Sequence, residues 1–113
     1  MRLHVDAYKD VLVLGISGSL FSENTDELEA LWKQILSRNP KTVAIDCFDI
    51  AHMDSVAIGV LVKLRNDAHE SGITLILLEP NRSVKNLFTI SRLEDFFTFS
   101  TKSDFEETYS IGT

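Results

Sequence analysis

The sequence predicts an α/β domain with a mixed, mostly parallel sheet of four to five strands and about four helices. The length of 113 residues suits one domain. Apolar runs of strand length alternate with amphipathic helical stretches, which implies parallel strands joined by right-handed crossovers. Two consecutive strand-like segments open the chain and predict an antiparallel hairpin, which makes the sheet mixed. We therefore expect a single domain over residues 1–113.

The first two elements are the strands of that hairpin. Residues 2–8 alternate apolar with mostly polar side chains, which is the period of a half-buried strand. Residues 11–16 are almost continuously apolar, which predicts a strand buried more fully. Lys9 and Asp10 form the short polar break between them. A connection this tight favours antiparallel pairing at one side of the sheet.

A turn over residues 18–22 is expected to lead into the first helix. Asn24 is the predicted N-cap, and Glu27 three residues later completes a capping-box pattern. Asn39-Pro40 ends the helix, because the residue before a proline disfavours the helical conformation. The side chains with helical spacing on its inner face are Leu28, Leu31, Trp32, Ile35 and Leu36.

The second half of the chain continues the alternation. A strand at 43–45, buried on both faces, precedes a short polar connection and a second helix that ends at Gly72. Its inner stripe is Ala57, Val60, Leu61, Leu64 and Ala68. This second helix is predicted over 54–71. The elements predicted after it are a strand over 73–78, a helix over 82–90, an edge strand over 96–99 and a helical turn over 104–109.

Composition excludes several classes of function. The formal net charge is −6, and an acidic chain with scattered Lys and Arg would be repelled by nucleic acids and anionic membranes. The longest apolar run, 56–62, is far shorter than a membrane span, and the N-terminus lacks a signal-peptide core. The single cysteine, Cys47, forms no internal disulfide and is expected to be a small buried hydrophobe. We expect a cytoplasmic protein without nucleic-acid partners, membrane insertion or a cofactor.

The most informative segment is Met53-Asp54-Ser55. It places a serine where a buried strand has ended and a helix begins. The N-terminus of a helix favours anions, because its first N–H groups lack partners within the helix and the helix dipole is positive there. A phosphorylated serine at that point would alter a surface without unfolding the domain. The simpler interpretation is that Asp54 or Ser55 only caps the helix.

Residues 43–59 resemble the signature of the STAS domain, the family of bacterial anti-sigma factor antagonists that also occurs at the end of sulphate transporters. The family pattern is an apolar strand ending in Asp, a short connection, and Met-Asp-Ser-Ser-Gly-Leu-Gly opening a helix. The positions that match or nearly match are Asp46, Met53, Asp54, Ser55, Ile58 and Gly59. The turn at 18–20 and the apolar tail over 84–97 resemble the corresponding parts of the family.

The resemblance implies a non-enzymatic regulator. Ser55 would accept a phosphate from an anti-sigma factor that has a histidine-kinase-like ATPase domain. The unphosphorylated chain would bind that partner and free the sigma factor, and a serine phosphatase would reset the phosphorylated form. The partner-binding residues that it implies are Phe21, Met53, Asp54, Ser55, Val56, Ala57 and Ile58.

Three departures from the pattern leave a second function open. Val56 replaces the second serine of the motif, Ala57 replaces its glycine, and Phe21 replaces an aspartate expected near Ser55. The alternative is a phosphorylation-independent interaction module in a sensory scaffold or a transporter-associated assembly. A hydrolase built on Ser55, His52 and Asp49 is disfavoured, because proximity in sequence does not supply triad geometry. The three histidines lack metal-ligand spacing, so no metal site is expected.

Overall fold

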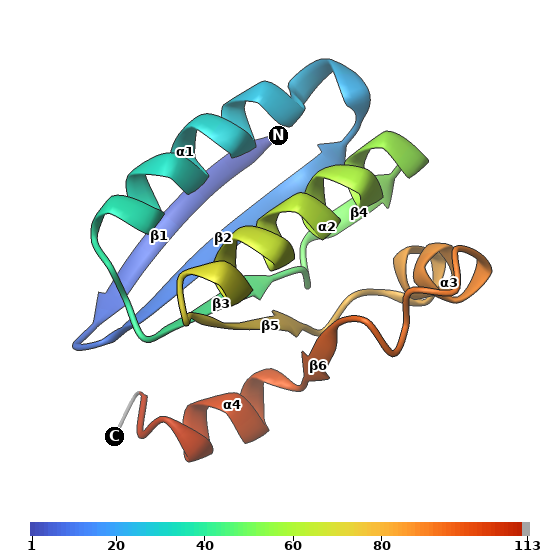
Figure 1. Cartoon of the computed structure of the whole chain (residues 1–113). Helices are drawn as coiled ribbons and strands as arrows, with labels where there is room; N and C mark the ends of the chain where they lie inside the picture. Colours follow the sequence, from blue (N-terminus) through green and yellow to red (C-terminus); the bar gives the residue numbers. More distant parts are fainter. Residues whose placement is uncertain (112–113) are drawn as a thin grey trace.

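The computed structural model describes residues 1–111, in which one six-stranded sheet carries helices on both of its faces (Figure 1). The predicted alternation of strands and helices is confirmed. In chain order the elements are β1 (Arg2–Tyr8), β2 (Val11–Leu20), the 3-10 turn η1 (Ser22–Asn24), α1 (Thr25–Ser37), β3 (Thr42–Asp46), β4 (Ile50–Met53), α2 (Ser55–Glu70), β5 (Thr74–Leu78), α3 (Arg82–Ile90), β6 (Thr98–Ser100) and α4 (Lys102–Thr108).

The sheet is mixed and mostly parallel, as predicted. Its strand order is β1-β2-β3-β5-β6, and β4 pairs separately with the far end of β2. Among the strands of the described chain, β1 and β2 alone pair antiparallel, while β2–β3, β2–β4, β3–β5 and β5–β6 are parallel. The ends of β2 and β4 pair at Leu20 and Met53, directly beside the start of α2.

The sequence analysis missed β4 and ended β2 too early. The predicted turn at 18–22 is wrong over its first part, because Gly18, Ser19 and Leu20 continue β2 and pair with β4. The register shifts between Gly18 and Ser19, so the extension is irregular. Glycine and serine predict a turn locally, but pairing with a distant segment holds this stretch extended.

Asn24 occupies the predicted N-cap position of α1, but the predicted capping by its side chain is wrong. Its side chain makes no cap hydrogen bond at the start of α1, and Glu27 completes no capping box there. The Asn24 Oδ1 atom instead accepts a hydrogen bond from the backbone N–H of Phe21, and Nδ2 donates to the carbonyl of Ser19. The 3-10 turn η1 precedes α1, so Asn24 closes the turn that leads into the helix.

The other element boundaries fall close to those predicted. Helix α2 begins at Ser55 and ends at Glu70, two residues before Gly72. The φ of Gly72, 71°, is in the left-handed region that glycine adopts easily. Helix α3 covers the predicted residues, with Asn81 as its N-cap. The edge strand β6 begins at Thr98, two residues later than predicted.

The main core lies between the sheet and the helices α1, α2 and α3. Trp32 of α1 is 2% exposed and donates its indole Nε1–H to Oδ2 of Asp67 in α2 at 3.2 Å. Phe88 of α3 is fully buried and meets Phe97 edge to face, with ring centroids 5.1 Å apart. The hydrogen bond from Trp32 to Asp67 joins α1 and α2, which lie side by side over one face of the sheet (Figure 1).

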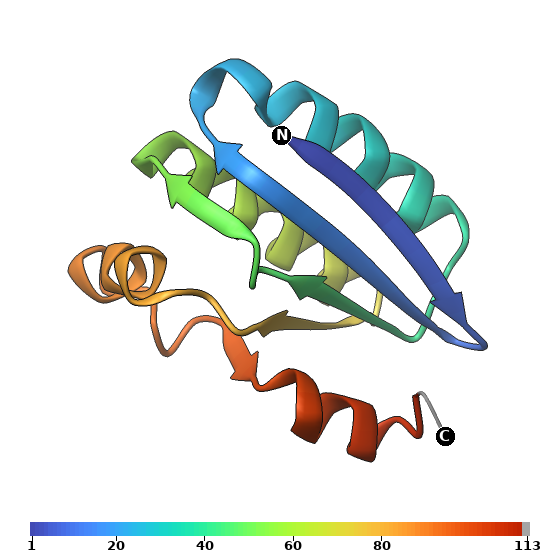
Figure 2. The same ribbon diagram turned by 180° about the vertical axis from the view of Figure 1, so that it is seen from behind.

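A smaller core covers part of the opposite face. Phe105 of α4 packs there against Ala44 of β3 and against Ile76 and Leu78 of β5. Figure 2 shows this face from behind, with no helix across the broad surface of β1 and β2. Within residues 1–111, no helix has the length and apolar character that crossing a membrane requires.

Candidate functional site

Asp54 organises the start of α2. It is the N-cap residue, and its Oδ1 accepts a hydrogen bond from the backbone N–H of Ala57 at 2.9 Å. Its other carboxylate oxygen, Oδ2, accepts from the backbone N–H of Ser22 in η1 at 2.9 Å. These two hydrogen bonds hold the pKa of the Asp54 carboxyl below its usual value of 3.8, and the bond from Ala57 has the larger effect. One ionised carboxylate thus joins two segments that lie 32 residues apart in sequence.

Ser55 is the first residue of α2 and its side chain is exposed. Within residues 1–111 its hydroxyl forms no hydrogen bond. The simpler interpretation allowed either Asp54 or Ser55 to cap the helix, and the residue that does so is Asp54. The hydroxyl therefore stands at the positive end of a helix of 16 residues, accessible from solvent. This is where a phosphate group would be stabilised by the helix and its first backbone N–H groups.

The predicted partner-binding residues divide into two groups. The side chains of Met53, Ala57 and Ile58 are buried, at 7%, 0% and 3% exposure, and belong to the main core. They shape the backbone under the surface but do not present their side chains to a partner. Val56 is 52% exposed beside Ser55. Of these four residues, only Val56 presents its side chain to solvent.

Phe21 is brought close to this site by the Asp54 bridge. It is partly buried, and it directly precedes Ser22, whose backbone N–H donates to Asp54. The sequence analysis did not identify Ser22 as part of the site. No local pattern marks a residue whose backbone N–H, rather than its side chain, makes the long-range contact.

Gly59 is one of the positions that match the family signature, and the structure shows its surroundings. It lies in the interior of α2, one turn after Ser55, and is exposed. A Cβ atom built on Gly59 would have no neighbouring atom within 4 Å. Packing inside the chain therefore does not require glycine here, although glycine lowers helix stability by roughly 0.5–1 kcal/mol relative to alanine.

The residues considered for a hydrolase are not assembled into a triad. His52 and Asp49 are exposed, and within residues 1–111 no hydrogen bond joins either of them to Ser55. In the same described part of the chain, no group of three or more His, Cys, Asp or Glu side chains is arranged to hold a metal ion. Cys47 is fully buried, and burial raises the pKa of its thiol to about 12, as expected for an inert core residue.

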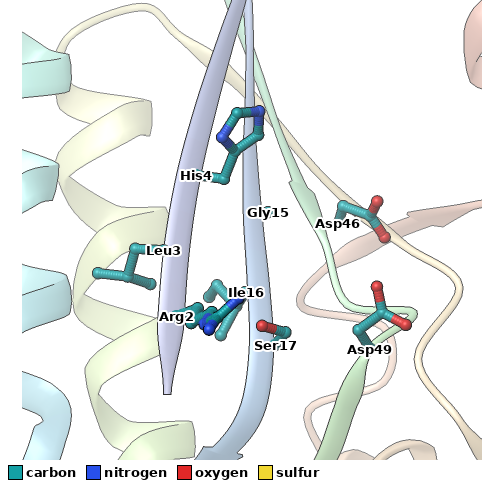
Figure 3. Close-up of a pocket in the computed structure, with 8 residues that line it drawn as sticks. All are labelled: Arg2, Leu3, His4, Gly15, Ile16, Ser17, Asp46 and Asp49. Carbon is teal, nitrogen blue, oxygen red and sulfur yellow. The ribbon is translucent and has the colours of Figure 1, made fainter.

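A groove of about 390 Å³ lies on the sheet face opposite α1 and α2 (Figure 3). Basic groups from β1 lie on one side and carboxylates from β3 and the following loop on the other. Ser55 does not line it, so the groove is separate from the serine site. Its lining residues are Arg2, Leu3, His4, Gly15, Ile16, Ser17, Asp46 and Asp49.

Solved structures with the same architecture include three of anti-sigma factor antagonists. A candidate antagonist from Thermotoga maritima superposes with a TM-score of 0.85 at 21% identity, covering 96% of this chain and 94% of that one. SpoIIAA in its unphosphorylated form superposes with a TM-score of 0.75 at 17% identity, and the match covers 99% of this chain and 100% of that one. The Bacillus SpoIIAA in its phosphorylated form superposes with a TM-score of 0.74 at 16% identity, and the match covers 95% of this chain and 98% of that one. At such low identities these similarities establish the shared fold.

The family signature is matched across almost the whole chain. The model of the STAS domain family aligns with residues 2–107, which include the opening hairpin, the Met53-Asp54-Ser55 segment and nearly all of α4. The strand order, the N-terminal hairpin and the four helices agree with that alignment. This chain therefore belongs to the STAS domain family.

Proposed function

We propose that this chain is a cytoplasmic, non-enzymatic regulator of the anti-sigma factor antagonist type, controlled by phosphorylation of Ser55. Its partner is an anti-sigma factor with a histidine-kinase-like ATPase domain, which it binds when Ser55 is unmodified. That partner transfers the phosphate, and a serine phosphatase removes it. Binding of the unmodified chain to the anti-sigma factor frees a sigma factor, which then changes transcription.

The observation that carries the proposal is the free hydroxyl of Ser55 at the start of α2. Asp54 already supplies the cap, so the stability of the helix does not need this hydroxyl. A serine that is exposed, unpaired among the described residues and placed at a helix N-terminus is accessible to a kinase. Phosphorylation there adds close to two negative charges, which the helix dipole favours.

The same charge is unfavourable for a partner that covers Ser55. A surface that desolvates the phosphate or places a carboxylate opposite it loses binding energy. A penalty of about 3 kcal/mol weakens binding on the order of a hundredfold. The domain itself stays folded, because Ser55 is exposed and both oxygens of Asp54 remain bonded to backbone N–H groups.

Val56 and Gly59 extend the proposed contact surface along α2. Val56 presents an exposed apolar side chain next to the serine. Gly59, one turn further along, leaves space that allows the backbone of a partner to approach closely. The chain thus offers a small apolar surface with a modifiable hydroxyl at its edge. Phe21, which the Asp54–Ser22 contact holds nearby, completes the surface.

The test is an affinity capture from native cell extract that compares Ser55→Glu with the unaltered chain as baits. Ser83→Glu is the matched control, since Ser83 is an exposed serine in the first turn of α3. Phosphopeptide mapping of the chain isolated from the same cells locates any phosphate. We expect a kinase-like ATPase protein on the unaltered and Ser83→Glu baits, its loss on Ser55→Glu, and phosphate on Ser55.

Other outcomes contradict the proposal. If all three baits retain the same partners and no phosphate is found on Ser55, the chain is a phosphorylation-independent interaction module.

Gly59→Ala distinguishes an effect on partner binding from an effect on stability. We expect this variant to raise the free energy of unfolding by roughly 0.5–1 kcal/mol. It should nevertheless weaken capture of the same partner. Unchanged capture would remove Gly59 from the contact surface.

A further inference from the structure

β1 is the edge strand on one side of the sheet, and its outer edge faces no other strand of the described chain (Figure 2). All seven residues of β1 pair with β2 in an unbroken register, from Arg2 opposite Ser17 to Tyr8 opposite Val11. Every second residue therefore directs its backbone N–H and C=O away from β2. Within residues 1–111, the other strands with an unpaired side are β4 and β6, which have only four and three residues. The long open edge of the sheet is thus β1.

This edge lacks two of the structural devices that usually prevent strands from pairing with other chains, although it carries the charged side chains of Arg2 and Asp6. β1 has no proline and no bulge. Its apolar side chains, Leu3 and Val5, point to the helix side and pack partly on the main core. Its polar side chains lie on the opposite, open face, where Arg2 and His4 line the groove (Figure 3). β1 has the two-faced pattern of a strand inside a sheet.

The sequence of β1 complements itself when two copies run antiparallel about a two-fold axis at His4. That register places Arg2 of each copy opposite Asp6 of the other, on the open face. It also places Leu3 opposite Val5, on the helix side. Opposite charges and paired apolar side chains across antiparallel strands both stabilise such a ladder. A two-fold axis through Asp6 would instead set Asp6 against its own copy.

The charges needed for this pairing are available. Arg2 is exposed, and within residues 1–111 its guanidinium has no hydrogen bond or ion pair. Asp6 uses one oxygen, Oδ1, to contact His4 Nε2 at 3.0 Å on the surface. An Arg2 guanidinium from a second copy can approach the other oxygen.

We propose that β1 is a homodimer interface, in which two copies pair edge to edge about His4 to form one continuous sheet. The interface is isologous, as in most two-fold dimers. β1 lies on one side of β2, whereas β3 and β4 lie on the other (Figure 2). The dimer therefore leaves the start of α2 and Ser55 uncovered on both copies. This inference does not depend on phosphorylation of Ser55.

Charge exchange tests the interface by sedimentation velocity over a concentration series. In Arg2→Asp, positions 2 and 6 are both acidic, and in Asp6→Arg both are basic, so each variant repels its own copy. We expect the unaltered chain to dimerise and each variant alone to be a monomer. An equimolar mixture of the two variants should recover the dimer, because each then meets its complement. This recovery also shows that both variants are folded.

Cross-linking tests the register. Residues on the axis face their own copy at a Cα separation of about 4.5–5.5 Å, within the range that a disulfide spans. His4→Cys should therefore form a disulfide-linked dimer on mild oxidation. Ser91→Cys, at an exposed serine after α3, is the control and should link far more slowly. The buried Cys47 does not interfere.

Two results would overturn the proposal. The first is an unaltered chain that stays monomeric at about 1 mM, where a millimolar association would be half formed. The second is a dimer that neither charge reversal disrupts and that His4→Cys does not cross-link faster than Ser91→Cys. That dimer would use another surface.

Discussion

Asp54 connects the start of α2 to the turn before α1, and replacing it with alanine tests how the serine site is held. Asp54→Ala removes the acceptors of two backbone N–H groups, those of Ala57 and Ser22, each at 2.9 Å. Losing an N-cap costs about 1 kcal/mol, and losing the second bond near the surface costs a similar amount. We expect the free energy of unfolding to fall by about 2 kcal/mol.

Thermal unfolding followed by circular dichroism measures this loss. For 113 residues the unfolding entropy is about 0.24 kcal/mol/K, so the melting temperature should fall by about 8 °C. Asp54→Asn keeps one carbonyl acceptor and should lose about half as much. Ser55→Ala is the control, since its hydroxyl has no hydrogen bond among the described residues; it should change stability by less than about 0.5 kcal/mol.

The pH dependence gives an independent check. The hydrogen bonds from Ala57 and Ser22 lower the pKa of Asp54 in the folded state, so near this pKa the unfolded chain binds more protons. The stabilisation is complete above the usual pKa of 3.8 and is lost as the pH falls through the lower, folded value. The difference in stability between the unaltered chain and Asp54→Asn should shrink over that range. Equal melting temperatures for Asp54→Ala and Ser55→Ala would refute this account.

Two further predictions concern the core. Trp32→Phe removes the hydrogen bond to Asp67 and part of a buried ring, and it should lower the free energy of unfolding by about 1–2 kcal/mol in urea denaturation. A change below about 0.5 kcal/mol would contradict that packing role. The Cys47 thiol should react with a thiol reagent only after denaturation. Because burial raises its pKa from 9.0 to about 12, the unfolded thiol ionises first, and stability should decrease as the pH rises above 9.0. Rapid labelling of the native protein would argue against this burial.

Much of the fold was predictable because its signals are local. The apolar period of α1 and α2 and the glycine after α2 each act within a few residues. The same is true of the serine: the change from strand to helix around Met53-Asp54-Ser55 is visible in the sequence. These features positioned the site before its geometry was known.

The remaining part of the site depended on contacts between distant segments. Nothing near Gly18 indicates that β2 continues to Leu20, because its partner β4 lies more than thirty residues further along the chain. The bond from Ser22 to Asp54 spans a similar distance and uses a backbone N–H, which carries no side-chain signature. Asn24 has the chemistry of a cap but bonds to the turn before the helix.

The sequence alone determined most of the strands and helices, though not β4 or the end of β2, and it determined that a helix begins at Asp54-Ser55, because periodicity and capping act over one or two turns. Only the tertiary structure decided which side chains of the motif reach solvent. It buries Met53, Ala57 and Ile58 and leaves Ser55 and Val56 exposed. The orientation of a helix over a sheet is set by the packing of the whole core, and that packing sums contacts from every part of the chain.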